Sequence, residues 1–259
     1  MELNNNAAIL AVRNRESLFV LYSQATRLPF VTCDEESFND QAWFFASEEE
    51  IKEYGKALAE KKYATMGMKY EKKNFGQLYG ILYAIGVNTI VWSEGEARQE
   101  IELEKLAKQA DFSKLEEAKR PLVNPSLELS AIYFMQEMRR PLTMEEHQEN
   151  GIRDLEEELL ANLRKSEFYL PMSPDPENPK DPKKVRFPFM KDKNGKVMQP
   201  VFSDIMELQK FSQGKQLRMI KVPFVKLPGV MIPNAECFVF NPLGINLTLN
   251  KEQMEKLTK

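Results

Sequence analysis

The sequence predicts an α/β protein made of two tandem homologous modules, each a mixed β-sheet covered by helices. Residues 41–106 and residues 199–257 follow the same plan. In each stretch an aromatic strand leads into a short helix, and a later apolar strand is followed closely by a glycine. Two prolines within residues 120–125 mark a boundary, because proline interrupts regular structure. We therefore assign residues 1–120 to a first module and residues 121–259 to a second.

Matching side chains occur at corresponding places in the two stretches. The closing glycines are Gly95 and Gly244, and the large aromatic residues of the late strands are Trp92 and Phe240. We expect both aromatic residues to be buried in equivalent strands. The remaining pairs, first stretch against second, are Phe45-Ala46-Ser47 against Phe202-Ser203-Asp204, Ile51 against Leu208, Tyr54 against Phe211, and Ile90-Val91 against Phe238-Val239.

In the first module, apolar residues at three- and four-residue steps predict helix over residues 7–23. Ser47 is a typical N-cap, and the three glutamates after it favour the first turn of a helix. The other expected elements, in order, are strands at 28–32, 43–45 and 63–70, an apolar helix at 75–85, a strand at 88–93 and a helix-like segment at 104–119.

In the second module, Asn124 and Pro125 are typical of a helix start, and this helix ends before Pro141. Thr143 and Glu146 form a capping-box pattern that starts another helix. The later expected elements are an apolar helical stripe at 152–163, a strand at 168–171, a hairpin at 185–201, a helix at 205–211 capped by Asp204, strands at 216–222, 235–241 and 245–249, a broken helix at 223–232, and a last helix capped by Asn250.

Composition limits the class of protein. The 259 residues contain 42% hydrophobic and 29% charged residues, enough apolar material for one large domain or two small ones. The net charge of −3, with basic residues interleaved among acids, argues against a nucleic-acid partner. Since no apolar run of about 18 residues occurs, we expect no membrane span. The N-terminus lacks the features of a signal peptide, and Cys33 and Cys237 indicate thiols in a reducing compartment, so we expect a cytoplasmic protein.

The sequence shows no catalytic site. His147 is the single histidine and lies in a polar helix start, which predicts a solvated side chain. Without a second histidine, a serine–histidine–aspartate triad or a histidine-based zinc site is not available by the usual routes. Glycine-rich phosphate loops and paired cysteines are also missing from the sequence. We therefore expect no enzyme, no catalytic or metal-binding residue and no cofactor.

One turn is a candidate binding surface. Asn241, Pro242, Leu243 and Gly244 form a turn signal, and loops carry function more often than cores do. Together with the proline-rich loop at 173–184, this turn differs most from the first module. One interpretation of the turn is structural. The other, which makes it the candidate partner-binding surface, is that these four residues face solvent and contact a protein partner.

The second half of the chain resembles a known family. The segments LEEELLANLRKSEFYLPM, VFSDIMELQKF and FVFNPLGINLTLNKEQMEKL resemble the N-terminal domain of SseB-like proteins, named for enhanced serine sensitivity. The family pattern falls on 168–171, 200–211 and 238–257. The first half resembles a degenerate copy, with Trp92-Ser93-Glu94 where the family has an Asn-Pro pair. The resemblance implies a bacterial, cytoplasmic protein that modulates a partner and is not itself an enzyme.

Three functional hypotheses follow. The leading one is a protein-interaction or regulatory factor that binds a protein partner, with neither nucleic acid nor membrane involved. The first alternative is an enzyme or small-molecule binder that uses a cleft between the modules, where pockets commonly form. The second alternative is a type III secretion-associated protein, because an unrelated translocon protein bears the same name. The lack of an apolar membrane-inserting segment argues against that role.

Overall fold

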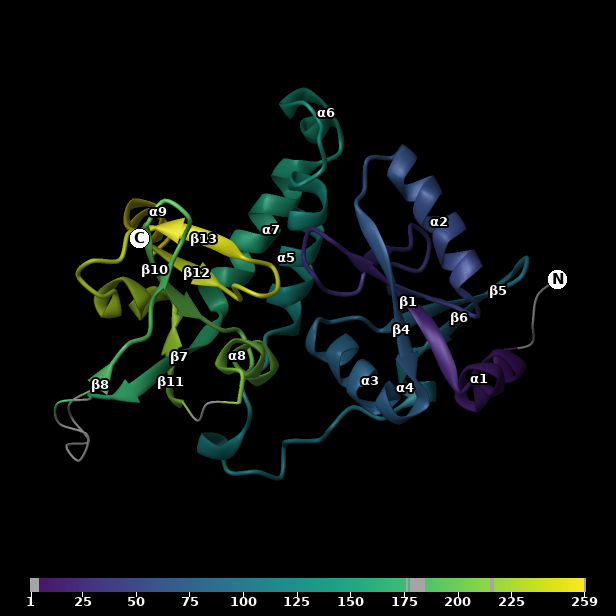
Figure 1. Ribbon diagram of the computed structural model, residues 1–259, viewed down its shortest axis with the longest axis horizontal. Helices are drawn as coiled ribbons and strands as arrows, with labels where there is room; N and C mark the ends of the chain where they lie inside the picture. The colour runs from purple at the N-terminus through teal and green to yellow at the C-terminus, as the bar shows by residue number, and fades with distance from the viewer. Residues whose placement is uncertain (1–4, 176, 178–184, 215–216, 259) are drawn as a thin grey trace. The chain divides into compact units, whose positions relative to one another are not determined.

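The computed structural model describes residues 5–175, 177, 185–214 and 217–258. The chain divides into two compact units (Figure 1). The first unit is Met1–Lys114 with Glu128–Glu156, and the second is Leu115–Leu127 with Glu157–Lys259. Both units combine helices with a β-sheet, so the chain is an α/β protein.

The predicted division at residue 120 differs from these two units. Residues 128–156 were assigned to the second module, but they pack with the first unit. Gln136 explains this, because its side-chain amide donates to the carbonyl of Val31 and its side-chain oxygen accepts from the Val31 N–H. The hydroxyl of Tyr133 also donates to Asp40, at 2.7 Å. Side-chain hydrogen bonds over such a sequence distance leave no signal in the local pattern.

The first unit contains a six-stranded sheet. Its order is β4-β1-β3-β5-β6, and β2 pairs with β3 beside this path. β3 and β5 run parallel, with Phe44 opposite Trp92, and the other pairs are antiparallel. The elements are α1 (Asn5–Asn14), β1 (Ser17–Ser23), β2 (Val31–Cys33), β3 (Asp40–Phe45), α2 (Glu48–Glu60), β4 (Thr65–Glu71), the 3₁₀ helix η1 (Lys72–Asn74), α3 (Phe75–Ala84), β5 (Thr89–Glu94), β6 (Ala97–Glu102), α4 (Leu103–Leu106), α5 (Pro125–Met138) and α6 (Met144–Glu149).

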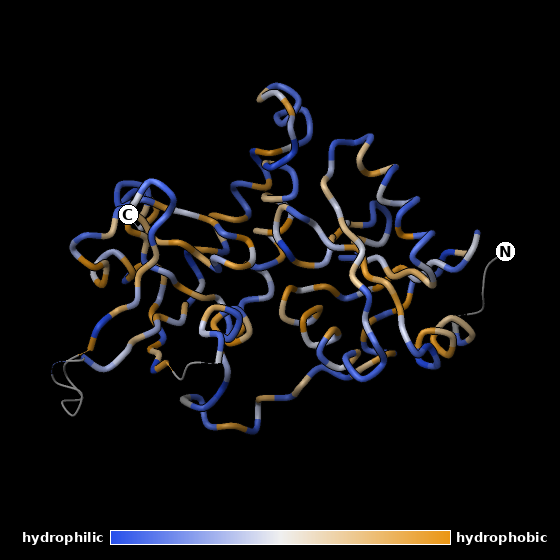
Figure 2. The backbone as a smooth tube through the Cα atoms, viewed as in Figure 1, coloured by the Kyte–Doolittle hydropathy of each residue, from blue (hydrophilic) through white to orange (hydrophobic). Residues whose placement is uncertain are grey.

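Helix α2 covers one face of this sheet. Its Ile51 and Leu58 are buried against Leu21 and Phe45, and the opposite side of the helix is charged. Figure 2 shows the same contrast: the strands of the unit are largely hydrophobic, whereas hydrophobic and hydrophilic residues alternate along α2. Ser47 caps the helix in a complete capping box with Glu50, as predicted.

The second unit divides its strands between two sheets. One sheet has the order β13-β12-β10-β9 and the other β11-β7-β8. β10 and β12 run parallel, with Val201 opposite Phe240. The elements are η2 (Glu117–Lys119), α7 (Ile152–Lys165), β7 (Glu167–Pro174), β8 (Val185–Arg186), β9 (Met190–Lys191), β10 (Val197–Val201), α8 (Ile205–Ser212), β11 (Arg218–Pro223), η3 (Phe224–Val230), β12 (Cys237–Phe240), β13 (Leu247–Asn250) and α9 (Lys251–Leu257).

The two units share one order of elements and one pattern of strand pairing. From β3 to α4 the first unit runs strand, helix, strand, helix, strand, strand, helix, and the second unit does the same from β10 to α9. β1 lies between β3 and β4, with Phe19 opposite Phe45. In the second unit β7 pairs with β11, and Tyr169 forms an antiparallel bridge with Phe202. Phe19 and Tyr169 therefore occupy corresponding positions.

One element was predicted wrongly. Residues 7–23 were expected to be helical, but α1 ends at Asn14 and β1 begins at Ser17. Leu18, Phe19 and Tyr22 fit a helical spacing, yet they lie in a strand that is hydrogen-bonded on both sides. The expected helix-like segment at 104–119 is also shorter, because only α4 and the single turn η2 form there.

Candidate binding groove

A groove in the first unit runs between helix α2 and the edge strand β4. It has a volume of about 650 Å³ and is lined entirely by residues of β1, α2, β4 and their connections. Phe19, Leu21 and Ile51 form an apolar floor. Lys52 and Lys56 on α2 and Lys69 on β4 lie around it, and the lining includes one acid, Glu48. Three lysines against one glutamate give the groove a positive charge.

Two glycines bring the walls of the groove close together. Gly55 lies within α2 and Gly67 within β4, where glycine weakens both kinds of element. A Cβ atom on Gly67 would lie 3.2 Å from the side chain of Ile51, and one on Gly55 would lie 3.4 Å from Oγ1 of Thr65. The helix therefore approaches the strand closely, because neither glycine carries a side chain that would lie between them.

Strand β4 forms an open edge of the sheet. It pairs with β1 on one side, and none of the strands in the described chain pairs with its other side. An unpaired edge presents free backbone N–H and C=O groups that can pair with another chain. Met66 and Met68 on this strand are each 39% exposed. The edge thus combines backbone hydrogen-bonding capacity with accessible apolar side chains.

The predicted recognition turn lies mostly in the interior. Asn241 is 1% exposed, and Pro242 and Gly244 are also buried, so the prediction that they face solvent is wrong. The Asn241 side-chain oxygen accepts from the N–H of Ser203, and its amide donates to the Ser203 hydroxyl at 2.8 Å. These bonds tie the end of β12 to the start of α8. Leu243 alone of the four is partly exposed, and partner binding through it stays a prediction.

Two buried carboxylates lie beneath this turn. Asp204 caps α8, and Glu207 is 4% exposed and paired with Lys210. Burial raises the pKa of Glu207, against the opposing effect of Lys210. Burial likewise raises the pKa of Asp204, although backbone hydrogen bonds from α8 oppose it. Raised carboxyl pKa values are typical of acid–base sites. Here both side chains are sealed from solvent, so we interpret the pair as structural.

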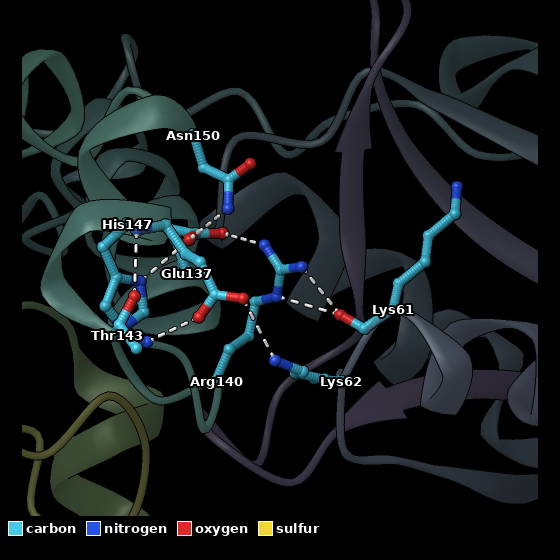
Figure 3. A network of polar contacts seen from close by, with 8 residues as sticks. Lys61, Lys62, Glu137, Arg140, Thr143, His147 and Asn150 are labelled. Carbon is cyan, nitrogen blue, oxygen red and sulfur yellow. Dashed lines mark hydrogen bonds and ion pairs between the residues drawn. The ribbon is translucent and has the colours of Figure 1, made fainter.

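A second polar cluster joins α5, α6 and the end of α2 (Figure 3). Glu137 accepts hydrogen bonds from His147, Arg140 and Asn150, and Arg140 in turn donates to the carbonyl of Lys61. Burial would raise the pKa of Glu137, but these hydrogen bonds together lower it. His147 is 4% exposed, so the prediction of a solvated histidine is wrong. This network fastens α5 and α6 to the first unit.

Within the described ranges, no three His, Cys, Asp or Glu side chains lie close enough to hold a metal ion. None of the helices in those ranges is both long and apolar enough to cross a membrane. The proline-rich loop at 173–184 was expected to join the turn at 241–244 in a partner-binding surface. Most of this loop lies outside the described residues.

The comparison with protein families agrees with the resemblance seen in the sequence. Residues 143–256 match the family described as SseB protein N-terminal domain. This part of the chain is SseB-like. The SseB-like match contains α7, the strands β7 to β13 and the turn at 241–244.

Comparisons beyond the family are weaker. No curated protein matches the chain. A solved structure, Tic22 from Plasmodium falciparum, is 10% identical to it, over 93% of this chain and 90% of that chain, with a TM-score of 0.22. A likeness at that score carries no argument about this chain.

Sequence reasoning missed the groove, although a signal for it was present. An isolated glycine within a helical pattern, or within a strand pattern, marks a close approach of backbones. Gly55 and Gly67 are such glycines, twelve residues apart in consecutive elements. Each glycine could be recognised in the sequence, but the contacts that they allow, Gly55 with Thr65 and Gly67 with Ile51, depend on how α2 packs on the sheet.

Proposed function

We propose that the protein is a non-catalytic interaction factor, and that its first unit binds a protein partner in the groove between α2 and β4. The observation that carries this proposal is an apolar groove, rimmed by lysines, beside an unpaired strand edge. Partner strands commonly add to such edges, with backbone hydrogen bonds giving affinity and side-chain pockets giving specificity. The burial of Asp204 and Glu207 supports a structural role for the carboxylates with raised pKa.

The origin of the two units belongs to the same proposal. We propose that they are copies of one module, of which the second has kept the SseB-like sequence and the first has diverged. The shared order of elements and the shared strand pairing support this. We also propose that the protein works in the bacterial cytoplasm, as the family resemblance implies. The divergence of the first copy would then have opened its groove to a partner.

The test places a photo-crosslinking amino acid in the groove. Ala59 is exposed and lines the groove, whereas Ala57 is exposed on the same helix but does not. In cells of the source bacterium we expect a specific protein to cross-link from position 59 and not from position 57. That protein, identified and purified, should bind the wild-type chain and Ala57→Trp but not Ala59→Trp, whose indole fills the groove.

Two outcomes would overturn the proposal. One is a purified partner that binds Ala59→Trp and Ala57→Trp equally well. The other is turnover of a substrate by the purified chain that disappears when Asp204 or Glu207 is replaced by its amide. Thermal melts of both tryptophan variants show whether each remains folded.

A further inference from the structure

The occupant of the groove can be inferred from the second unit, where the corresponding site is already covered by the chain itself. Residues 119–121 lie with Tyr169, Ile205, Met219 and Lys221 around a depression between β11 and α8. The correspondence between the two sites follows from the strand registers. In the first unit, Lys69 of β4 lies opposite Phe19 of β1. In the second unit, Lys221 of β11 lies opposite Tyr169 of β7.

The covering segment is held by one apolar anchor and two backbone contacts. Leu122 packs on the cluster of Tyr169, Phe202 and Leu208. Its N–H donates to the hydroxyl of Tyr169 at 2.8 Å. Lys221 donates from Nζ to the carbonyl of Arg120, also at 2.8 Å, and Arg120 has an extended backbone. A short extended peptide, with leucine as its anchor, therefore fits the face between edge strand and helix.

The first unit offers the same face, and none of its described residues forms a segment like 119–122 over it. Its residues Phe19, Phe45 and Ile51 correspond to Tyr169, Phe202 and Leu208, the cluster beneath Leu122. Lys69, the counterpart of Lys221, forms an exposed ion pair with Glu71 at 3.0 Å. Such exposed pairs contribute little to stability, so this lysine can exchange its partner at small cost.

Two differences distinguish the open face from the covered one. Gly67 stands where the second unit has Met219, so the side chain of Met219 has no counterpart on the open face. Phe19 stands where the second unit has Tyr169, so a hydroxyl that would accept a backbone N–H is missing. An occupant of the first groove would therefore form one hydrogen bond fewer.

We propose that the first unit binds an extended acidic peptide segment of a partner protein, anchored by a proline–leucine pair, as residues 119–122 bind the second unit. The extended form and the leucine anchor follow from the covered counterpart. The acidic character follows from Lys56 and from Lys69, which can exchange Glu71 for the peptide, while Lys52 is paired with Glu48. This inference rests on the proposed function and specifies the chemistry of the partner.

The first experiment uses labelled synthetic peptides and the purified full-length chain. We expect the peptide EEDPLVEE to bind in a fluorescence anisotropy titration. The peptide EEDPSVEE, without the apolar anchor, and the basic peptide KKRPLVKK should each bind at least about ten-fold more weakly. Added salt should weaken binding of the acidic peptide, because exposed charges are screened. Equal binding of the leucine and serine peptides would overturn the proposal.

Variants then locate the peptide. Ala59→Trp should abolish binding, while Ala57→Trp, its matched control, should not change it. Phe19→Tyr restores the hydroxyl found at Tyr169 and should tighten binding about three- to ten-fold, the range expected for one added hydrogen bond. Weaker or unchanged binding by Phe19→Tyr would contradict the proposed backbone contact, and equal binding by the two tryptophan variants would contradict the site.

The remaining outcomes separate this inference from the proposed function. If the native partner needs the groove but neither leucine peptide binds, the acidic-segment proposal fails and the interaction role survives. If wild-type chain self-associates in sedimentation experiments and Ala59→Trp does not, the occupant is a second copy, which overturns the proposal for a separate partner. If no partner needs the groove, the proposed function itself fails.

Discussion

Gly244 leaves the space that the carboxylate of Glu207 occupies: a Cβ atom at position 244 would lie 2.8 Å from Oε2 of Glu207. The first unit also places a glutamate beside the corresponding glycine, but through a different contact. Gly95 donates its N–H to Oε1 of Glu50 at 2.6 Å, and both glutamates are the third residue of their helices. A Cβ atom on Gly95 would meet no described atom within 4 Å, and its backbone has a φ of 62°, which favours glycine. Gly244 is therefore required by the space that Glu207 fills, and Gly95 by its backbone conformation.

Gly244→Ala should destabilise the protein by about 1–3 kcal/mol, the usual cost of forcing an extra methyl group into a packed site. Urea unfolding at neutral pH measures this. Gly229→Ala is the matched control, because a Cβ there meets no atom of the described residues within 4 Å. In a Glu207→Ala background the cost of Gly244→Ala should shrink, since the carboxylate is gone. An equal cost in both backgrounds would show that another atom causes the strain.

Glu207 should make stability fall as pH rises. Its pKa is raised by burial, so the folded state holds its proton at pH values where the unfolded chain has lost it. The destabilisation begins near the unfolded pKa of about 4.3 and grows until the pH passes the folded pKa. Glu207→Gln removes this contribution. The difference in unfolding free energy between variant and wild type should therefore shift in favour of the variant as pH rises, and a constant difference would contradict the raised pKa.

Glu137 should have the opposite dependence. Its pKa is lowered by the hydrogen bonds that it accepts, so its contribution is complete above the unfolded pKa and is lost as pH falls through the folded pKa. Glu137→Gln should cost roughly 1.5–3 kcal/mol at pH 7, the range for hydrogen bonds to charged groups. The cost should diminish on acidification. Glu149→Gln, at an exposed position on the same helix as His147, is the control and should change the free energy of unfolding at pH 7 by less than about 0.5 kcal/mol.

Local signals in the sequence predicted much of the fold. Ser47, Thr143, Asp204 and Asn250 accept the hydrogen bonds expected of N-caps, because capping depends on residues only three apart. Strand β1 was missed because its apolar spacing fits a helix equally well. The segment forms a strand and not a helix because it pairs with β3 and β4, which lie at least 17 residues further along the chain.

The candidate sites were harder to predict than the elements. Asn241 lies in a turn by sequence, but its burial depends on Ser203, 38 residues away. His147 lies in a polar helix start, yet Glu137 on the preceding helix buries it. The groove depends on Gly67 lying against Ile51, 16 residues earlier in the chain, and on Gly55 lying against Thr65. In each case a local pattern fixes the element, and a contact distant in sequence fixes the environment of the side chain.

Trp92 and Phe240 should be equally important to their units. Both are buried, as predicted, in the strands β5 and β12, each opposite the strand that precedes α2 or α8. Replacing either with alanine should cost roughly 3–5 kcal/mol, as for other large buried aromatic residues. Denaturant unfolding measures the loss. A cost below about 1 kcal/mol for either variant would contradict its place in the core.

Gly55→Ala should stabilise the protein while narrowing the groove. Glycine in a helix interior is about 1 kcal/mol less favourable than alanine, and the new Cβ would lie 3.4 Å from Oγ1 of Thr65, an ordinary contact. Gly67→Ala is compared with it, because the new Cβ would lie 3.2 Å from the side chain of Ile51. This contact is tighter than usual and would displace a buried residue. We expect a higher melting temperature for Gly55→Ala and a lower one for Gly67→Ala. A lower melting temperature for Gly55→Ala as well would contradict this expectation. It would mean that α2 lies closer to β4 than the 3.4 Å contact indicates, and that the groove is narrower.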